Sequence, residues 1–69
     1  MRLFIAEDEA PARERLVELI ARVAPQARVL GHAETVQGTR DWLAAQGPPD
    51  LLLLDIQLAD GLSLELFHD

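Results

Sequence analysis

The first third of the chain changes from a short apolar run to the apolar spacing of a helix. Residues 3–6 are all apolar and meet three acids at 7–9, which predicts a short buried strand ending in a polar loop. Pro11 suits the first turn of a helix, where its missing N–H costs nothing. The apolar face of this helix follows the i, i+3, i+4, i+7 spacing and is formed by Leu16, Leu19, Ile20 and Val23. Pro25 ends the helix.

The middle of the chain repeats the alternation of strand and helix. In the second predicted strand, residues 27–33, small or apolar positions alternate with polar ones and are Val29, Gly31 and Ala33. Thr35 can cap a second helix that runs through about Ala45. The residues expected to face inward from this helix are Val36, Leu43 and a half-buried Trp42.

Four consecutive leucines mark the last third of the chain. Leu51 to Leu54 follow two prolines and are apolar on both faces, which predicts a strand of a parallel sheet covered by helices on each side. Asp60 and Gly61 indicate a turn. Beyond the turn, Ser63 can cap the start of a third helix that carries Leu64, Leu66 and Phe67.

These elements follow one another as β-α-β-α-β, with the opening of a further helix. Right-handed crossovers join such strands into a parallel sheet, so the predicted fold class is α/β. Sixty-nine residues without a repeat, a low-complexity tract or a linker make a single small domain at most.

The charge balance narrows the possible partners. Twelve acids stand against six basic residues, all of them arginine, for a net charge of −6. Such a surface does not attract phosphate backbones, so we expect no nucleic-acid contact by this segment. No stretch has the pattern of a signal peptide or a membrane span, so a cytoplasmic protein without membrane contact is expected. The absence of cysteine excludes disulfides and thiolate metal sites.

The candidate chemistry lies where two strands end. The first predicted strand ends at Glu7, Asp8 and Glu9, and the third ends at Asp55. Ligands of open parallel sheets bind outside the carboxyl ends of the strands, so neighbouring strands would bring these acids together. Crowded carboxylates need a compensating charge, and Mg²⁺ prefers oxygen ligands of this kind. A Mg²⁺-dependent phosphoryl site is therefore predicted, with Glu9 more suited to the helix N-terminus than to the metal.

Two segments resemble one family. Residues 5–16 (IAEDEAPARERL) are similar to the opening of response-regulator receiver domains, above all those joined to LytTR-type DNA-binding domains. Residues 51–66 (LLLLDIQLADGLSLEL) resemble the phosphoacceptor segment of the same group, at the expected separation. The resemblance implies a flavodoxin-like fold with strand order 2-1-3. It also implies a bacterial two-component pathway that regulates transcription.

The resemblance assigns roles to four residues. It implies that Asp55 accepts a phosphoryl group from a sensor histidine kinase and contributes to the Mg²⁺ site. Asp8 matches the direct metal ligand, Glu7 the neighbouring acid that acts through water, and the backbone carbonyl of Gln57 the third protein ligand. Such a domain phosphorylates itself in a phosphorelay and is not a turnover enzyme.

The chain also departs from the family's pattern. Ala59 stands where a proline is frequent, and Glu7 where an aspartate is commoner. Receiver domains have five strands, with a Ser or Thr after the fourth and a Lys after the fifth, whereas this chain has no lysine. Residues 1–69 are therefore expected to be the N-terminal portion of one receiver domain. Strands four and five and a DNA-binding output domain are expected to belong to the parent protein.

Two other functions stay open. The chain could be a non-catalytic fragment that forms homo-oligomers, by domain swapping or through an exposed third strand, because a bare apolar edge invites pairing. A phosphatase with an aspartyl-phosphate intermediate is disfavoured, since that class needs an Asp two residues after the nucleophile and Gln57 stands there. Four further residues are expected to be structural or solvated, with kinase contact an alternative for the two arginines: His32, His68, Arg13 and Arg15.

Overall fold

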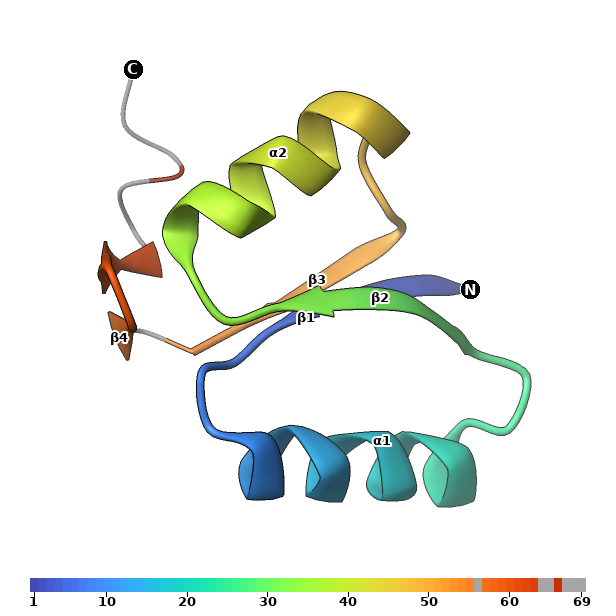
Figure 1. Cartoon of the computed structure of the whole chain (residues 1–69). Coiled ribbons are helices and arrows are strands. Elements are labelled where there is room, and N and C mark those ends of the chain that lie inside the picture. Colours follow the sequence, from blue (N-terminus) through green and yellow to red (C-terminus); the bar gives the residue numbers. More distant parts are fainter. Residues whose placement is uncertain (56, 64–65, 67–69) are drawn as a thin grey trace.

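The fold is a three-stranded parallel sheet with one helix on each face (Figure 1). A computed structural model describes residues 1–55, 57–63 and 66. The main elements are β1 (Arg2–Ala6), α1 (Ala10–Val23), β2 (Arg28–Ala33), α2 (Val36–Gln46) and β3 (Leu51–Leu54). The α/β class and the strand order β2-β1-β3 confirm the prediction. Neither helix in the described part of the chain is long and apolar enough to cross a membrane.

The central strand β1 forms the core. Leu3, Phe4, Ile5 and Ala6 are at most 2% exposed, because β1 has a strand on each side and a helix above and below. Ala6 pairs with Ala33 of β2 and with Leu54 of β3, so all three strands end at the same edge of the sheet. The predicted short buried strand at residues 3–6 is confirmed.

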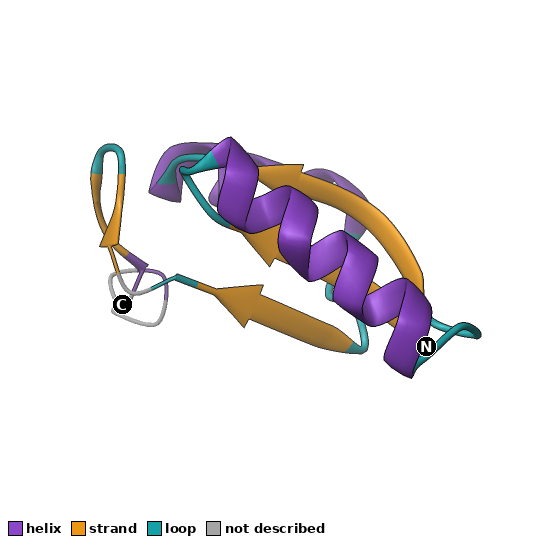
Figure 2. Ribbon diagram, turned by 90° about the horizontal axis from the view of Figure 1, so that it is seen from below, coloured by secondary structure: helices purple, strands orange, loops and turns teal. Residues whose placement is uncertain are grey.

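The helices α1 and α2 lie on opposite faces of the sheet, as Figures 1 and 2 show. Order β2-β1-β3 demands this, because the two crossovers run in opposite directions and right-handed crossovers then cover different faces. The bounds of α1 agree with the prediction, but its expected inward face is only partly correct. Leu16 and Ile20 are half-buried, whereas Leu19 and Val23 are 52% and 72% exposed. The apolar face of α1 is wider than the surface that this narrow sheet offers to it.

Helix α2 packs on the other face as predicted. The Thr35 side chain accepts a hydrogen bond from the Gly38 N–H at 2.8 Å and so caps the helix. Trp42 is half-buried and stacks on Phe4, with ring centroids 4.2 Å apart. Gly31 makes room for this pair, since a Cβ atom there would lie 3.1 Å from the Trp42 Nε1. Thr39 is also fully buried, a position that sequence reasoning missed, and its hydroxyl donates to the Thr35 carbonyl at 2.8 Å.

The third strand and the segment after it differ from the prediction. β3 is an edge strand in the described part of the chain, so its expected central position is not met there. The expected cover on both faces is only partial, because Leu52, Leu53 and Leu54 are half-buried and Leu51 is exposed. The predicted turn at Asp60 and Gly61 lies in a small antiparallel hairpin formed by β4 (Gln57–Leu58) and β5 (Gly61–Leu62). Ser63 is buried. Most of the predicted third helix, with Leu64 and Phe67, lies outside the described residues, and so does His68.

The stack of Phe4 on Trp42 predicts the cost of a core substitution. Phe4→Leu should lower the free energy of unfolding by about 1–2 kcal/mol, because it removes the ring stack and leaves a small cavity. Urea titration followed by the fluorescence of Trp42, the single tryptophan, measures the change. The control Val23→Ala, at a position 72% exposed, should stay within about 0.5 kcal/mol of the parent. Equal losses in the two variants would contradict the assignment of β1 as the core.

Candidate metal centre

The ends of β1 and β3 carry the acids of the candidate site. Glu7 and Asp8 directly follow β1, and Asp55 directly follows β3. The parallel ladder continues past the strands: the Glu7 N–H donates to the Ala33 carbonyl and the Asp55 N–H to the Ala6 carbonyl, both at 2.9 Å. These bonds hold the backbone of both acids at the edge of the sheet. Strand order reverses between β1 and β3, where a parallel sheet opens a crevice for ligands.

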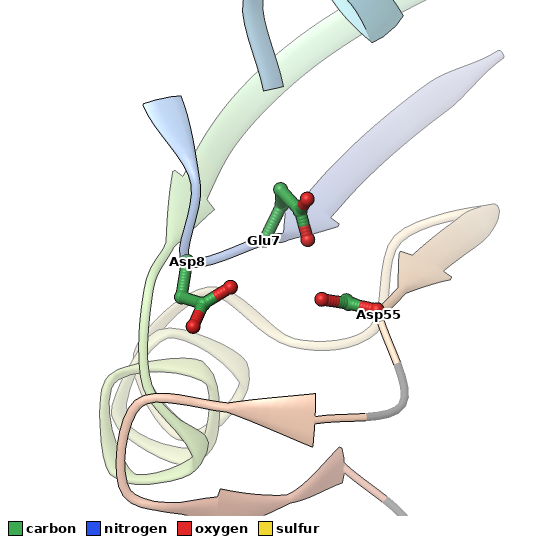
Figure 3. Close-up of side chains that lie close together, drawn as sticks. All are labelled: Glu7, Asp8 and Asp55. Atoms are coloured by element: carbon green, nitrogen blue, oxygen red, sulfur yellow. The ribbon is translucent and has the colours of Figure 1, made fainter. Parts of the chain in front are cut away.

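Three carboxyl groups meet at this edge (Figure 3). Glu7, Asp8 and Asp55 each offer an oxygen atom, and these three oxygens lie within 4.8 Å of one another. Glu7 is buried at 8% exposure, whereas the other two are half-buried. The sequence therefore predicted correctly that the acids of the first and third strands converge.

Burial and crowding change the protonation of Glu7. The pKa of its carboxyl is raised to about 7, first by loss of hydration, then by a hydrogen bond with the Asp55 side chain and by the negative charges of its neighbours. Without a cation, the protonated Glu7 can donate this hydrogen bond to the Asp55 carboxylate. A proton thus reduces the repulsion that the bare cluster would otherwise carry.

The donor set suits a hard divalent cation. It consists of carboxylate oxygens from three residues, without sulfur or imidazole, which matches the preference of Mg²⁺ and Ca²⁺ for oxygen ligands. A cation would replace the shared proton and neutralise the cluster more completely. Gln57 begins β4, two residues beyond Asp55, and its carbonyl oxygen stays a predicted ligand.

A hollow gives access to the cluster from the side of α1. It has a volume of about 290 Å³, and its lining includes Glu7 and Asp55 of the cluster, Leu16 of α1 and Leu53 of β3. Its mixed lining allows water or a small polar group to reach the carboxylates beside an apolar wall.

Arg13 is a residue whose place sequence reasoning missed. Its side chain is 15% exposed, and its guanidinium donates to the Glu7 carbonyl at 3.3 Å and pairs with Glu34 at 3.5 Å. It was expected on a solvated face, but it links α1 to the ends of β1 and β2. Arg13 lies in the first turns of α1, which begins directly after the three acids. This position in the sequence could have predicted a contact between Arg13 and the end of β1.

Other candidates lie outside the cluster. Glu9 is the exposed residue that precedes α1, as predicted, although its side chain makes no capping hydrogen bond. His32 is exposed on β2, which agrees with a solvated role. Asp60 does more than form a turn: its carboxylate accepts hydrogen bonds from the N-terminus of α2. Those bonds lower its pKa, the bond from the Val36 N–H most of all.

Comparison of the chain with protein-family models, curated proteins and solved structures found no match. The case for a function therefore depends on the fold and on the geometry of the acidic cluster.

The raised pKa of Glu7 predicts how stability depends on pH. The folded state holds a proton on Glu7 up to about pH 7, whereas the unfolded state releases it near pH 4.5. Without metal, the free energy of unfolding should therefore fall as the pH rises between these values, by about 3 kcal/mol. Glu7→Gln should abolish this fall and be more stable than the parent at pH 8. Urea titrations across pH 4–8 provide the test.

Glu18→Gln, an exposed acid on α1, is the matched control for the pH series. It should retain the fall in stability of the parent chain. Addition of Mg²⁺ at pH 8 should stabilise the parent chain more than Glu7→Gln, because the variant lacks one of the three carboxylates. A pH profile identical in parent and Glu7→Gln would contradict the raised pKa of Glu7.

Proposed function

We propose that the chain is the N-terminal part of a flavodoxin-like receiver domain, in which Asp55 takes a phosphoryl group from a histidine kinase in a Mg²⁺-dependent step. The observation that carries this proposal is the meeting of Glu7, Asp8 and Asp55 at the carboxyl ends of two adjacent parallel strands. The likeness of residues 5–16 and 51–66 to receiver segments agrees with it.

Asp55 is the best candidate for the phosphoacceptor. Its backbone is held by the hydrogen bond to Ala6, and its side chain is half-buried beside the open hollow. A carboxylate oxygen of Asp55 would form the bond to phosphorus while the bond from phosphorus to the kinase imidazole nitrogen breaks. The electron pair of that bond returns to the imidazole.

Asp8, Glu7, Asp55 and the Gln57 carbonyl are the groups that would hold the cation. A bound Mg²⁺ supplies neutralising charge at the carboxylates and at the incoming phosphoryl oxygens. The half-buried Asp8 suits direct ligation. Glu7, buried and hydrogen-bonded to Asp55, suits a role through a bridging water.

A turnover phosphatase fits the chain less well. A second carboxylic acid two residues after the nucleophile would be needed to protonate the leaving group, and Gln57 cannot supply a proton of that acidity. The proposed activity is therefore self-phosphorylation in a cytoplasmic phosphorelay, with a sensor kinase as the partner and a LytTR-type DNA-binding output domain in the parent protein. The net charge of −6 argues against nucleic-acid contact by this segment.

The phosphoacceptor assignment predicts the outcome of chemical phosphorylation. With acetyl phosphate and Mg²⁺, the parent chain should gain one phosphoryl group in intact-mass spectrometry. Asp55→Asn should gain none, because an amide oxygen is a poor nucleophile toward phosphorus. Asp41→Asn, an exposed acid of α2, is the matched control and should react like the parent. Labelling of Asp55→Asn, or labelling of the parent in excess EDTA, would refute the proposal.

The open edge of β3 supports a second candidate function, self-association. Within the described residues β3 pairs only with β1, and Leu51 at its start is 42% exposed. We propose that two copies join through this strand, since an unpaired apolar edge is a template for another chain.

Sedimentation velocity should show a concentration-dependent dimer that Leu51→Lys converts to monomer. Leu30→Lys, at a position 38% exposed on the other outer strand, is the control and should leave the dimer intact.

A further inference from the structure

The hairpin of β4 and β5 connects the candidate metal centre to the start of α2. It begins two residues after Asp55, and its two-residue tip, Ala59 and Asp60, reaches the N-terminus of that helix. The two Asp60 carboxylate oxygens accept hydrogen bonds from the Val36 N–H at 2.5 Å and the Gln37 N–H at 3.1 Å. We call this pair of bonds the Asp60–α2 contact.

The contact completes the first turn of α2. The first N–H groups of a helix have no partner within it. Thr35 takes the N–H of Gly38, and Asp60 takes those of Val36 and Gln37. Thr35 is the local cap, whereas Asp60 comes from 24 residues farther along the chain. A negative charge at this end also suits the helix dipole. The contact therefore ties together two distant segments and does more than cap a helix.

Two further contacts hold the hairpin. Leu58 of β4 is 3% exposed and belongs to an apolar cluster with Ala6 of β1 and Val36 of α2. The Ala59 N–H donates to the Glu34 carbonyl at 3.2 Å. One side of the hairpin is thus buried against the last residue of β1, and its tip is bound to the segment between β2 and α2.

Along the chain, Gln57 lies between these anchors and the last acid of the cluster, Asp55. It is followed directly by the buried Leu58 and precedes Asp60 by three residues, while Asp55 is fixed to β1 through the Ala6 carbonyl. A chain of three residues spans at most about 10 Å, so the anchored tip limits where the Gln57 backbone can lie. The carbonyl that the proposed function assigns to the cation is therefore restrained from the Asp60 side.

We propose that Asp60 is a positioning residue for the metal centre: the Asp60–α2 contact restrains the Gln57 backbone carbonyl, so that cation affinity depends on this contact. This inference rests on the proposed function and adds that the Asp60–α2 contact and the occupancy of the centre are coupled. Coupling of this kind is reciprocal, so a bound cation must strengthen the contact by the same factor.

Calorimetric titration with Mg²⁺ tests the inference. Asp60→Ala should weaken Mg²⁺ binding about tenfold, the usual effect of losing a group that orients a metal ligand. Asp60→Asn keeps one acceptor oxygen and should fall between Asp60→Ala and the parent. Thr35→Ala is the matched control, because it removes the other cap of the same helix turn without touching the hairpin. It should destabilise α2 to a similar degree but change Mg²⁺ affinity less than about twofold.

Hydrogen exchange on the parent chain gives a readout that needs no variant. Saturating Mg²⁺ should slow the exchange of the Val36 and Gln37 amides about tenfold, by reciprocity, and should slow the Gly38 amide, held by Thr35, less. Mg²⁺ binding by the parent with no change in Asp60→Ala would overturn this inference alone. The same holds for equal weakening in Asp60→Ala and Thr35→Ala. A parent chain that binds no Mg²⁺ would overturn the proposed function and this inference together.

Discussion

Parallel pairing of β1 with a strand on each side is the interaction on which the rest of the structure depends. It buries four consecutive apolar residues, Leu3 to Ala6, and aligns the carboxyl ends of three strands at one edge. Ladder hydrogen bonds continue one residue further and hold Glu7 and Asp55 at that edge. The element that supplies most of the core is therefore the element that positions the acids. Stability and the candidate site depend on the same strand.

Burial of the apolar residues of β1 brings the acids at its end close together, where their charges repel one another. β1 delivers Glu7 into a buried position next to two other carboxylates, and the pKa of Glu7 rises to about 7 in response. Such strain is common where function requires a charge in a dry place, because the surrounding fold overcomes the cost. A proton or a cation relieves it. The cluster can therefore exchange the shared proton for a bound cation.

The hairpin after Asp55 extends this coupling beyond the sheet. Leu58 packs with Ala6 and Val36, and Asp60 binds the first turn of α2. The acidic edge, the hairpin and the α2 N-terminus therefore form one connected unit. Helix α1 lies on the other face, where the hollow between Leu16 and Leu53 leaves the carboxylates open to the surroundings. The site is therefore packed against the hairpin and α2 on one side, and on the α1 side it is open through the hollow.

The sequence by itself determined the three strands of the sheet and its two helices, because local periodicity and proline positions depend on neighbouring residues. The strand order, and with it the meeting of the acids, followed only from the resemblance of residues 5–16 and 51–66 to receiver segments. The sequence did not determine how far α1 is covered, since the burial of Leu19 and Val23 depends on the width of the sheet beneath them. Nor did it determine the roles of Arg13 and Asp60. In the sequence, a turn aspartate looks the same whether water or the amides of a helix 24 residues away donate hydrogen bonds to it. Only the tertiary structure brings those amides to Asp60.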